Sequence, residues 1–395
     1  MQLFTVVVLT IVAVGGGSAQ LIKRVYRPED RFVAYKRRAV QFLKRDGELR
    51  ILACIHGEDH VNAVLTLLEI ARPSTVAPIS IHAIHLKPLA GRSASLLLPY
   101  TRHSTPYDAP SSSDTDHIFN AFFQAEQQHH SSGFSILPYV CISPYATMHE
   151  DICTLALDKK VFLIIVPFHK QLNIDGSFSS PIPAIQAVNS SVLRFSPCSV
   201  AVLVNHGLVK ENIMTFHSGA HPSPAVYFFG GPDDREALAL GLRMAEDPSV
   251  GLTVVRFRHP EASLDGTEER LDERMLEEVR MRGDGGSRVV YREEMVRDGE
   301  GIVGVIKEVS GRFSLLLVGR GDRKEMSLMC GLSTWSEYPE LGIVGDMLAS
   351  TDFGGRVSTL VVQQQRWVAG NGLPENMSMV GKHVVLLEED EDGDD

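Results

Sequence analysis

Short apolar segments alternate with amphipathic segments along most of this chain, and the alternation occurs twice. Val161–Pro167 and Phe313–Val318 are continuous apolar runs of strand length, and Ser199–Val204 and Ser358–Val362 follow them as a second pair. The two pairs recur after 152 and 159 residues. A strand without polar alternation is typical of a parallel sheet that helices cover on both faces. We therefore predict an α/β fold with two tandem doubly wound, mostly parallel-sheet domains.

Changes of composition bound the two predicted domains. We expect the first α/β domain over residues 48–206 and the second over residues 225–387. Residues 207–224 hold two glycines and two prolines, which interrupt helices and strands, and are expected to be a linker. Residues 388–395 read EEDEDGDD, and such a run of like charges predicts a disordered acidic tail.

The N-terminal residues begin with an apolar run. Residues 3–14 read LFTVVVLTIVAV, which alone is shorter than the roughly 20 residues that span a bilayer. A secretory signal would carry a lysine or arginine before its apolar run, but none precedes this run, and basic residues follow from Lys23 onward. The positive-inside rule then places the bulk of the chain in the cytosol. We expect residues 1–22 to be a short apolar helix, the end of a transmembrane helix in an endomembrane or the plasma membrane. An ordinary buried helix or strand is the alternative.

Residues 23–47 are expected to be a basic juxtamembrane linker. Residues 1–50 have a net charge of +6, whereas the whole chain has -11. A basic collar beside an apolar segment favours contact with a membrane surface, and the overall negative charge argues against a nucleic-acid partner. The mean hydropathy of -0.00 excludes a chain composed of many membrane spans.

Signals for catalysis, redox chemistry and metal binding are weak. No P-loop motif occurs, and the G-x-G-x-x-G at residues 299–304 follows a charged stretch, which favours a helix start over a dinucleotide site. His149-Glu150-Asp151 is also interpreted as a helix start, because acidic residues are favoured in a first turn. The five cysteines form no C-x-x-C pair and are expected to be reduced, mostly buried thiols of a cytosolic compartment. We expect neither an enzyme nor a metal site.

Glycines after two predicted strands are the best candidates for small-molecule binding. Open α/β sheets bind ligands at the carboxyl ends of their strands, where glycine lets phosphates approach the backbone. Two glycines follow the first strand of the second domain, and the others follow Phe313–Val318. The candidate nucleotide-binding residues are Gly230, Gly231, Gly319, Gly321 and Gly331. Glycines needed only for tight turns are the alternative.

Short motifs along nearly the whole chain carry a further signal. The first half contains Tyr35-Lys36-Arg37-Arg38, Leu52-Ala53-Cys54-Ile55-His56, Leu89-Ala90-Gly91-Arg92-Ser93, Met148-His149-Glu150-Asp151-Ile152-Cys153, Pro167-Phe168-His169-Lys170 and Pro197-Cys198-Ser199-Val200. The second half contains Phe228-Phe229-Gly230-Gly231-Pro232-Asp233-Asp234-Arg235-Glu236-Ala237-Leu238, Trp335-Ser336-Glu337-Tyr338-Pro339-Glu340-Leu341-Gly342, Asp346-Met347-Leu348-Ala349-Ser350 and Val361-Val362-Gln363-Gln364. Together these motifs resemble the cytosolic C-terminal half of a plant cation/proton exchanger, a branch of the monovalent cation:proton antiporter superfamily.

This resemblance implies a regulatory role in transport. Each domain is then similar to a universal-stress-protein domain, and the pair controls potassium/proton exchange, and with it cation and pH homeostasis, from the cytosolic side. The implied partners are a membrane transport domain, normally in the same chain, and a second copy in a homodimer. The chain is not expected to transport by itself, because that family's transport carboxylates lie within membrane helices.

The resemblance also bears on ATP. Nucleotide-binding stress proteins carry G-x2-G-x9-G-[ST], and Gly321 and Gly331 keep the x9 spacing, whereas Gly319 and Leu332 depart from the motif. The first domain has His169 after its strand and lacks the glycine pair. ATP is therefore a candidate cofactor of the second domain only. A free-standing nucleotide-binding stress protein is the alternative function.

Overall fold

The computed structural model is described for most of the central part of the chain. The described residues are helical positions Phe4, Val6, Val7, Leu9, Thr10, Ile11 and Val14, and then residues 38–71, 73–74, 77–90, 95–100, 113–128, 133–170, 178–206, 223–261, 266–284, 288–321, 327–329, 331–332, 336–350 and 357–366. Ala34–Arg366 forms one compact unit that contains all the described strands, and Met1–Val33 with Trp367–Asp395 forms a separate unit. The expected acidic tail and most of the expected linker at 207–224 lie outside the described residues.

The expected membrane segment is described only at scattered positions. Those positions are helical, and their apolar side chains are exposed. Within the described residues, no helix is both long enough and apolar enough to cross a membrane. The transmembrane assignment of residues 1–22 therefore stays a prediction.

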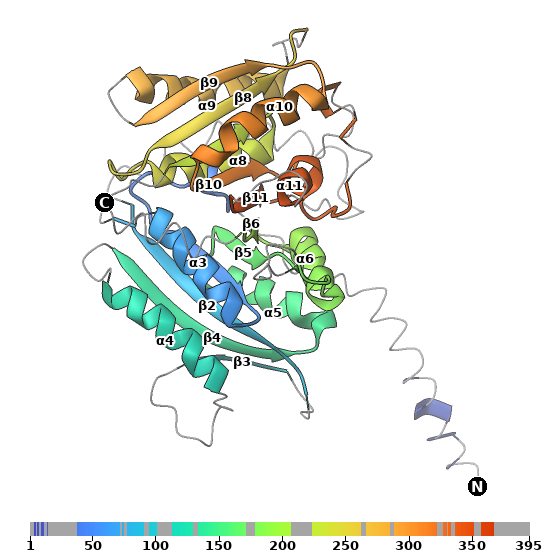
Figure 1. The fold of residues 1–395 in the computed structure, drawn as a ribbon. Coiled ribbons are helices and arrows are strands. Elements are labelled where there is room, and N and C mark those ends of the chain that lie inside the picture. The colour runs from blue at the N-terminus through green and yellow to red at the C-terminus, as the bar shows by residue number, and fades with distance from the viewer. Residues whose placement is uncertain are drawn as a thin grey trace, which may run out of the picture. The chain divides into compact units, whose positions relative to one another are not determined.

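A single eleven-stranded sheet runs through the compact unit (Figure 1). The first half contributes, in spatial order, β3 (Leu96–Pro99), β4 (Phe134–Ser143), β2 (Ile79–Pro88), β1 (Leu49–Ile55), β5 (Leu163–Pro167) and β6 (Ser199–Val204). The second half continues with β11 (Thr359–Gln363), β10 (Leu315–Gly319), β7 (Pro224–Phe228), β8 (Leu252–Arg258) and β9 (Val289–Met295). Neighbouring strands are parallel except at β3–β4 and β6–β11. The predicted doubly wound, mostly parallel α/β fold is confirmed.

The two halves share one strand order. Apart from the short edge strand β3, each half places its strands in the order third, second, first, fourth, fifth. The fifth strands, β6 and β11, pair antiparallel and join the halves into one sheet. Val202 lies opposite Val361 in this ladder, and the two are 159 residues apart, which is the repeat spacing of these strands. A local twofold axis therefore passes between equivalent residues of the two halves.

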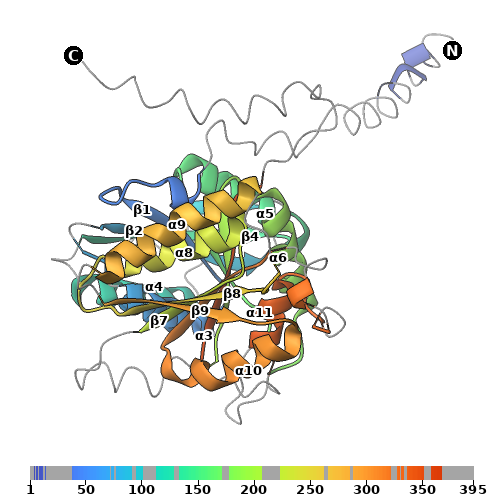
Figure 2. The same cartoon turned by 90° about the horizontal axis from the view of Figure 1, so that it is seen from above.

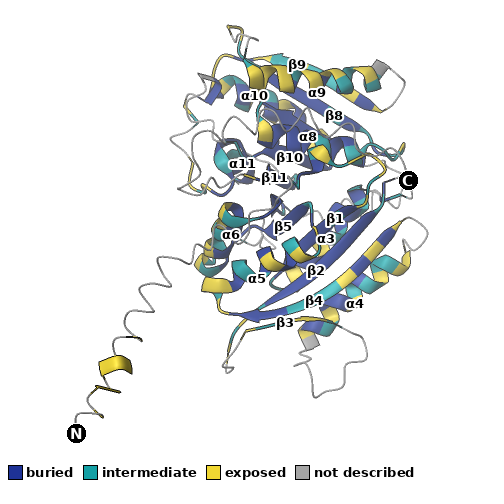
Figure 3. Ribbon diagram, turned by 180° about the vertical axis from the view of Figure 1, so that it is seen from behind, coloured by how far each residue is buried: buried dark blue, intermediate teal, exposed yellow. Residues whose placement is uncertain are grey.

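Helices cover both faces of the sheet (Figures 1 and 2). One apolar core packs under α3 (Glu58–Ala71), α4 (Ser113–Gln128), α8 (Pro232–Met244) and α9 (Thr267–Asp284). The other packs under α5 (Tyr145–Asp158), α6 (Pro183–Phe195), α10 (Gly299–Val309) and α11 (Gly342–Ala349). Short 3₁₀ helices lie at Val40–Phe42 (η1), Ser310–Arg312 (η2) and Ser327–Met329 (η3). Each core contains side chains from both halves, and β6 and β11, whose pairing forms the seam between the halves, are buried throughout (Figure 3).

Two smaller expectations are confirmed. The G-x-G-x-x-G at residues 299–304 begins helix α10 at Gly299. The described cysteines, Cys54, Cys141, Cys153 and Cys198, are buried free thiols. Burial raises the pKa of Cys198 to about 12, which keeps this thiol protonated and unreactive.

Candidate functional site

Four of the five candidate glycines meet at one edge of the sheet. Gly230 and Gly231 follow β7, while Gly319 ends the adjacent parallel strand β10 and Gly321 lies two residues later. Gly230 and Gly231 have φ angles of 112° and 94°, a left-handed backbone that favours glycine. The fifth candidate, Gly331, lies beyond η3. The structure thus brings four of the five glycines together, and their binding of a nucleotide stays a prediction.

The backbone amides at this edge are already bound by the carboxylate of Asp234, the third residue of α8. Its Oδ2 accepts hydrogen bonds from the backbone N–H groups of Phe229 (2.7 Å) and Gly230 (2.8 Å). Its Oδ1 accepts one from the N–H of Gly319 (2.8 Å). Asp234 is fully buried, and a Cβ at Gly319 would lie 2.4 Å from its Oδ1. Glycine at position 319 therefore admits this carboxylate.

Two further carboxylates bind the remaining glycine amides. Asp233 accepts hydrogen bonds from the N–H groups of Gly321 and Gln364, each at 2.9 Å. Asp272 of α9 accepts one from the N–H of Gly231 at 2.9 Å. Each of the four glycine amides therefore donates to a carboxylate of the protein. The amides of Gly230 and Gly319 share the carboxylate of Asp234. A phosphate at this edge would have to displace these carboxylates.

The role of these carboxylates was missed at the sequence level. Asp233 follows Gly230-Gly231-Pro232 at the start of a helix, where an acidic residue is favoured by the helix dipole in any case. The pattern by itself therefore indicates only a helix start. The sequence signal for this role is two adjacent aspartates together with glycines at the ends of two neighbouring strands. Glycine has no side chain to cover its backbone N–H, so another group must accept a hydrogen bond from that N–H when it is buried.

The equivalent edge of the first half is closed differently. His60 is the third residue of α3, as Asp234 is of α8, and its Nδ1 accepts a hydrogen bond from the N–H of His56 (3.3 Å). Burial lowers the pKa of His60 to about 4, which keeps the ring neutral and able to accept. Pro167 ends β5 where Gly319 ends β10, and proline has no N–H to satisfy. One imidazole nitrogen therefore does in the first half what two carboxylate oxygens do in the second.

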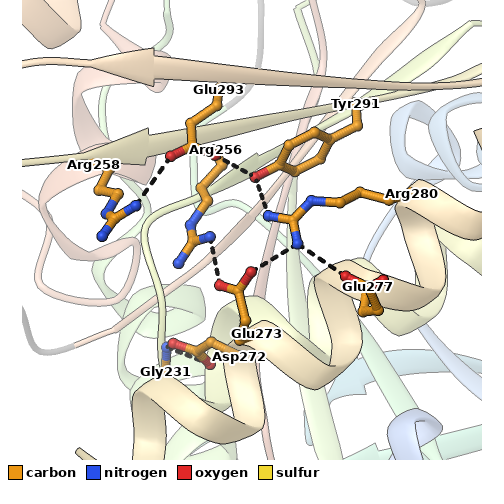
Figure 4. A network of polar contacts seen from close by, with 9 residues as sticks. All are labelled: Gly231, Arg256, Arg258, Asp272, Glu273, Glu277, Arg280, Tyr291 and Glu293. Carbon is orange, nitrogen blue, oxygen red and sulfur yellow. Dashed lines mark hydrogen bonds and ion pairs between the residues drawn. The ribbon is translucent and has the colours of Figure 1, made fainter. Parts of the chain in front are cut away.

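A network of charged side chains ties α9 to the strands beside it (Figure 4). Glu273, next to Asp272, accepts hydrogen bonds from Arg256 of β8 and from Arg280 of α9, each at 2.7 Å. Burial alone raises the pKa of Glu273, but these guanidinium groups lower it below its usual range. Arg280 also donates to the hydroxyl of Tyr291 on β9 at 3.2 Å. Ion pairs as well as apolar contacts therefore hold α9 over the Gly230-Gly231 turn.

Two of the family-like motifs meet at the seam between the halves. His169, after β5, places its Nδ1 in hydrogen-bond contact with Oε1 of Glu340, which precedes α11. Both side chains are buried, at 0% and 2% exposure. The next residue, Lys170, contacts the hydroxyl of Tyr338 and lies 4.4 Å from the centre of its ring. The rings of Phe168 and Tyr338 lie edge to face, 5.5 Å apart. The seam thus holds a buried hydrogen-bonded pair with one partner from each half.

Arginine and glutamine side chains fix the second half's part of this contact. Arg320 donates from Nη2 to the carbonyl of Pro339 (2.8 Å) and from Nε to the carbonyl of Glu340 (3.1 Å). Its Nη1 donates to Oε1 of Gln363 (2.7 Å), and Gln363 in turn donates to the carbonyl of Leu193 in the first half (2.7 Å). The residues flanking the candidate glycines therefore serve the contact between the halves.

The described side chains do not form a metal centre. Within the described ranges, no group of three or more His, Cys, Asp or Glu side chains is placed to hold a metal ion. In the motif His149-Glu150-Asp151, the ring of His149 on α5 lies 5.6 Å from the ring of Phe195 on α6. The arrangement instead offers hydrogen bonds and ring contacts across the seam.

Comparisons of the amino-acid sequence with known proteins identify the family of this chain. The family model described as "Plant cation/H(+) antiporter domain" matches residues 81–208, and "Plant cation/H(+) antiporter, C-terminal domain" matches residues 221–363. From Arabidopsis thaliana, the protein named Cation/H(+) antiporter 15 is 40% identical over 92% of this chain and 46% of its own length. Cation/H(+) symporter 13 of the same plant is 36% identical over 92% of this chain and 44% of its own length.

The chain thus spans slightly less than half the length of these curated relatives. Among solved structures, a universal stress protein from Archaeoglobus fulgidus is similar with a TM-score of 0.39 and 14% identity, over 80% of this chain and 96% of that protein.

Proposed function

The chain belongs to the plant cation/H(+) antiporter family, and we propose that it forms the cytosolic regulatory part of a membrane cation/proton antiporter. The observation that carries the proposal is the position of the two family models, one on each half of the sheet. One of them is described as the C-terminal domain of such antiporters. The ion pathway then belongs to membrane helices to which this chain is joined, and the two halves act on those helices from outside the bilayer.

Regulation requires that the halves have more than one arrangement. A ligand or a proton can shift such an equilibrium only by binding one arrangement more strongly than the other. The seam offers this dependence, because the buried His169–Glu340 contact changes strength with the charge of either partner. We propose that cytosolic pH acts on the transporter through this contact, and that potassium is the cation exchanged for protons.

The proposal can be tested with a hybrid transporter. In Cation/H(+) antiporter 15, the part that matches this chain is replaced by the whole of this chain, and a second form lacks that part altogether. Proton movement driven by a potassium gradient is then followed in sealed vesicles with a pH-sensitive dye at cytosolic-side pH values from 6 to 8. We expect the hybrid to exchange potassium for protons with a pH dependence that the truncated form lacks. A hybrid whose rates match the truncated form at every pH would overturn the proposal, and sodium in place of potassium tests the cation.

The alternative, a nucleotide-binding stress protein, is disfavoured by the occupied glycine amides. Asp233, Asp234 and Asp272 present negative charge where phosphates would lie. We propose that these carboxylates take the place of a nucleotide in the second half. Calorimetry of the full chain with ATP up to millimolar concentration should then give no binding heat, and saturable heat that Asp234→Asn increases would favour the alternative.

A further inference from the structure

Glu236 joins three parts of the chain although its side chain is fully buried. It lies on α8, in the second half, yet it binds the segment that precedes the first half. Oε1 accepts a hydrogen bond from the N–H of Val40 (2.5 Å), and Oε2 accepts one from the N–H of Gln41 (3.0 Å). The side chains of Ser199 and Gln364 also hydrogen bond to this carboxylate. Successive amides at the start of a helical turn form a natural cradle for an anion, which here is Glu236.

The same helix binds the carbonyl end of this segment. Arg243 lies seven residues after Glu236, on the same face of α8. Its guanidinium donates to the carbonyls of Arg45 (3.2 Å) and Gly47 (2.6 Å), and to the carbonyl of Pro78 (3.0 Å). We call residues 38–47 the strap. α8 thus offers a negative group to the amide end of the strap and a positive group to its carbonyl end, which matches the polarity of the turn.

Further contacts seat the strap in the seam. The N–H of Arg38 donates to Oε1 of Gln365 in the second half (2.5 Å). The guanidinium of Arg38 donates to the carbonyl of Leu157 in the first half (3.0 Å). The side-chain amide of Gln364 donates to Oε1 of Gln41 (2.7 Å). The strap therefore contacts both halves, but its charged partners, Glu236 and Arg243, come from the second half, about two hundred residues away in sequence.

We propose that α8 is the docking surface for the strap and that this docking is how the second half controls the part of the protein upstream of residue 38. The inference rests on the proposed function. A linker that only connected the first half to an upstream segment would need no partner in the second half. Glu236 accepts hydrogen bonds from both halves and from the strap. A change in the arrangement of the halves therefore alters how strongly α8 binds the strap. The proton is one signal that can act here, since burial raises the pKa of Glu236 while its hydrogen bonds from Ser199, Gln41, Val40 and Gln364 oppose that rise.

Hydrogen exchange on the full chain tests the docking. Glu236→Gln keeps the size of the side chain but removes the charge and one acceptor oxygen. We expect exchange of the amides in residues 38–47 to speed up by about tenfold, while the amides of β7 and the rest of α8 keep their protection. Glu308→Gln is the matched control, because Glu308 is an exposed glutamate on α10, and it should change nothing in the strap.

A second variant covers the case in which Glu236→Gln does not fold. Arg243→Met removes the contacts to the carbonyl end of the strap together with the hydrogen bond to Pro78, and it should speed exchange at residues 43–47 more than at residues 40–41. Unchanged strap exchange in both folded variants would overturn the docking. If the unmodified hybrid transporter shows no pH-dependent exchange, the proposed function itself fails. If the hybrid is active but Glu236→Gln speeds exchange in the strap without altering the transport rate of the hybrid, only the proposed regulation by strap docking fails.

Discussion

The two halves of the sheet bind the backbone amides at equivalent strand ends with side chains of different charge. In the second half, the carboxylate of Asp234 accepts from the amides of Phe229, Gly230 and Gly319. In the first half, the neutral ring of His60 accepts from one amide, and Pro167 has no amide to offer. The single imidazole nitrogen serves one amide, whereas the two carboxylate oxygens serve three. A repeated fold therefore preserves the backbone's need for hydrogen bonds, whereas the side chain that meets this need can differ in charge.

The difference extends to the buried titratable groups. Among the described residues, the histidines whose pKa is lowered by burial all lie in the first half: His56, His60, His82, His85, His149 and His206. The second half buries carboxylates and arginines instead, and burial raises the pKa of Glu236 and Asp272. A fall in pH therefore destabilises the folded first half, whose histidines are buried in the neutral form. In the second half, a fall in pH favours the protonated form in which the carboxyl groups are buried most easily.

The largest expected effect is the loss of Asp234. Asp234→Ala removes the carboxylate that three amides donate to, and at about 1–3 kcal/mol for each the free energy of unfolding should fall by about 3–9 kcal/mol. His60→Ala strands one amide and should cost about 1–3 kcal/mol in addition to its lost packing. Urea denaturation of the full chain followed by circular dichroism measures both. Equal losses in the two variants would contradict the donor count that distinguishes the halves.

Acidification should separate the halves next. Burial lowers the pKa of His60 and of His85 to about 4, below the ordinary value of 6.5, so their stabilisation is present above pH 6.5 and is lost as the pH falls towards 4. Each such histidine lowers the stability by about 1.4 kcal/mol per pH unit where only the unfolded state binds the proton. Hydrogen exchange at pH 6.5 and 5 should show protection falling first in β1, β2 and α3. Earlier opening of β7 and α8 would be the opposite of what we expect.

Breaking the seam pair should have a smaller effect. Glu340→Gln removes the charge that faces His169 and keeps the side chain's size, which should cost about 1–3 kcal/mol. Because the pair links the halves, exchange should increase in β6 and β11 more than in β1 or β8. Glu300→Gln on α10 serves as the control, and an increase confined to α11 would mean that the pair is a local contact and not a link between halves.

Salt should have the smallest effect and should act on α9. The partners of Arg280 are partly exposed, and exposed ion pairs contribute about 1 kcal/mol or less. At 1 M sodium chloride, where charges are screened within about 3 Å, amides of α9 should exchange a few times faster. Helix α8, whose acids are buried, should not respond. Equal salt sensitivity of α8 and α9 would remove this distinction between buried and exposed charge.

Much of the fold could be predicted from the sequence because it rests on local patterns. Continuous apolar runs such as Val161–Pro167 identify buried parallel strands, and their recurrence identifies the repeat. The glycines at 230–231 and 319–321 lie at one edge of the sheet because parallel strands bring their carboxyl ends together. The division at residues 207–224 stays a prediction.

The seam could not be predicted from the same patterns. A fully apolar strand shows that both of its faces are covered but carries no information about its neighbour, so the pairing of β6 with β11 was not foreseen. The roles of Glu236 and Glu340 likewise depend on partners about two hundred residues away. The glycines predicted a phosphate cradle because the pattern does not reveal that Asp233 and Asp234 supply the anion.

The central claim is that the seam between the halves controls cation/proton exchange. The most direct measurement is potassium-driven proton flux in vesicles that hold the hybrid transporter, with and without Glu340→Gln, across cytosolic-side pH values from 6 to 8. Hydrogen exchange on the same variant reports whether the seam has loosened. We predict that the loosened variant loses the pH dependence of the unmodified hybrid and matches the form without this chain. Full pH-dependent flux in a variant whose seam has measurably opened would contradict the claim.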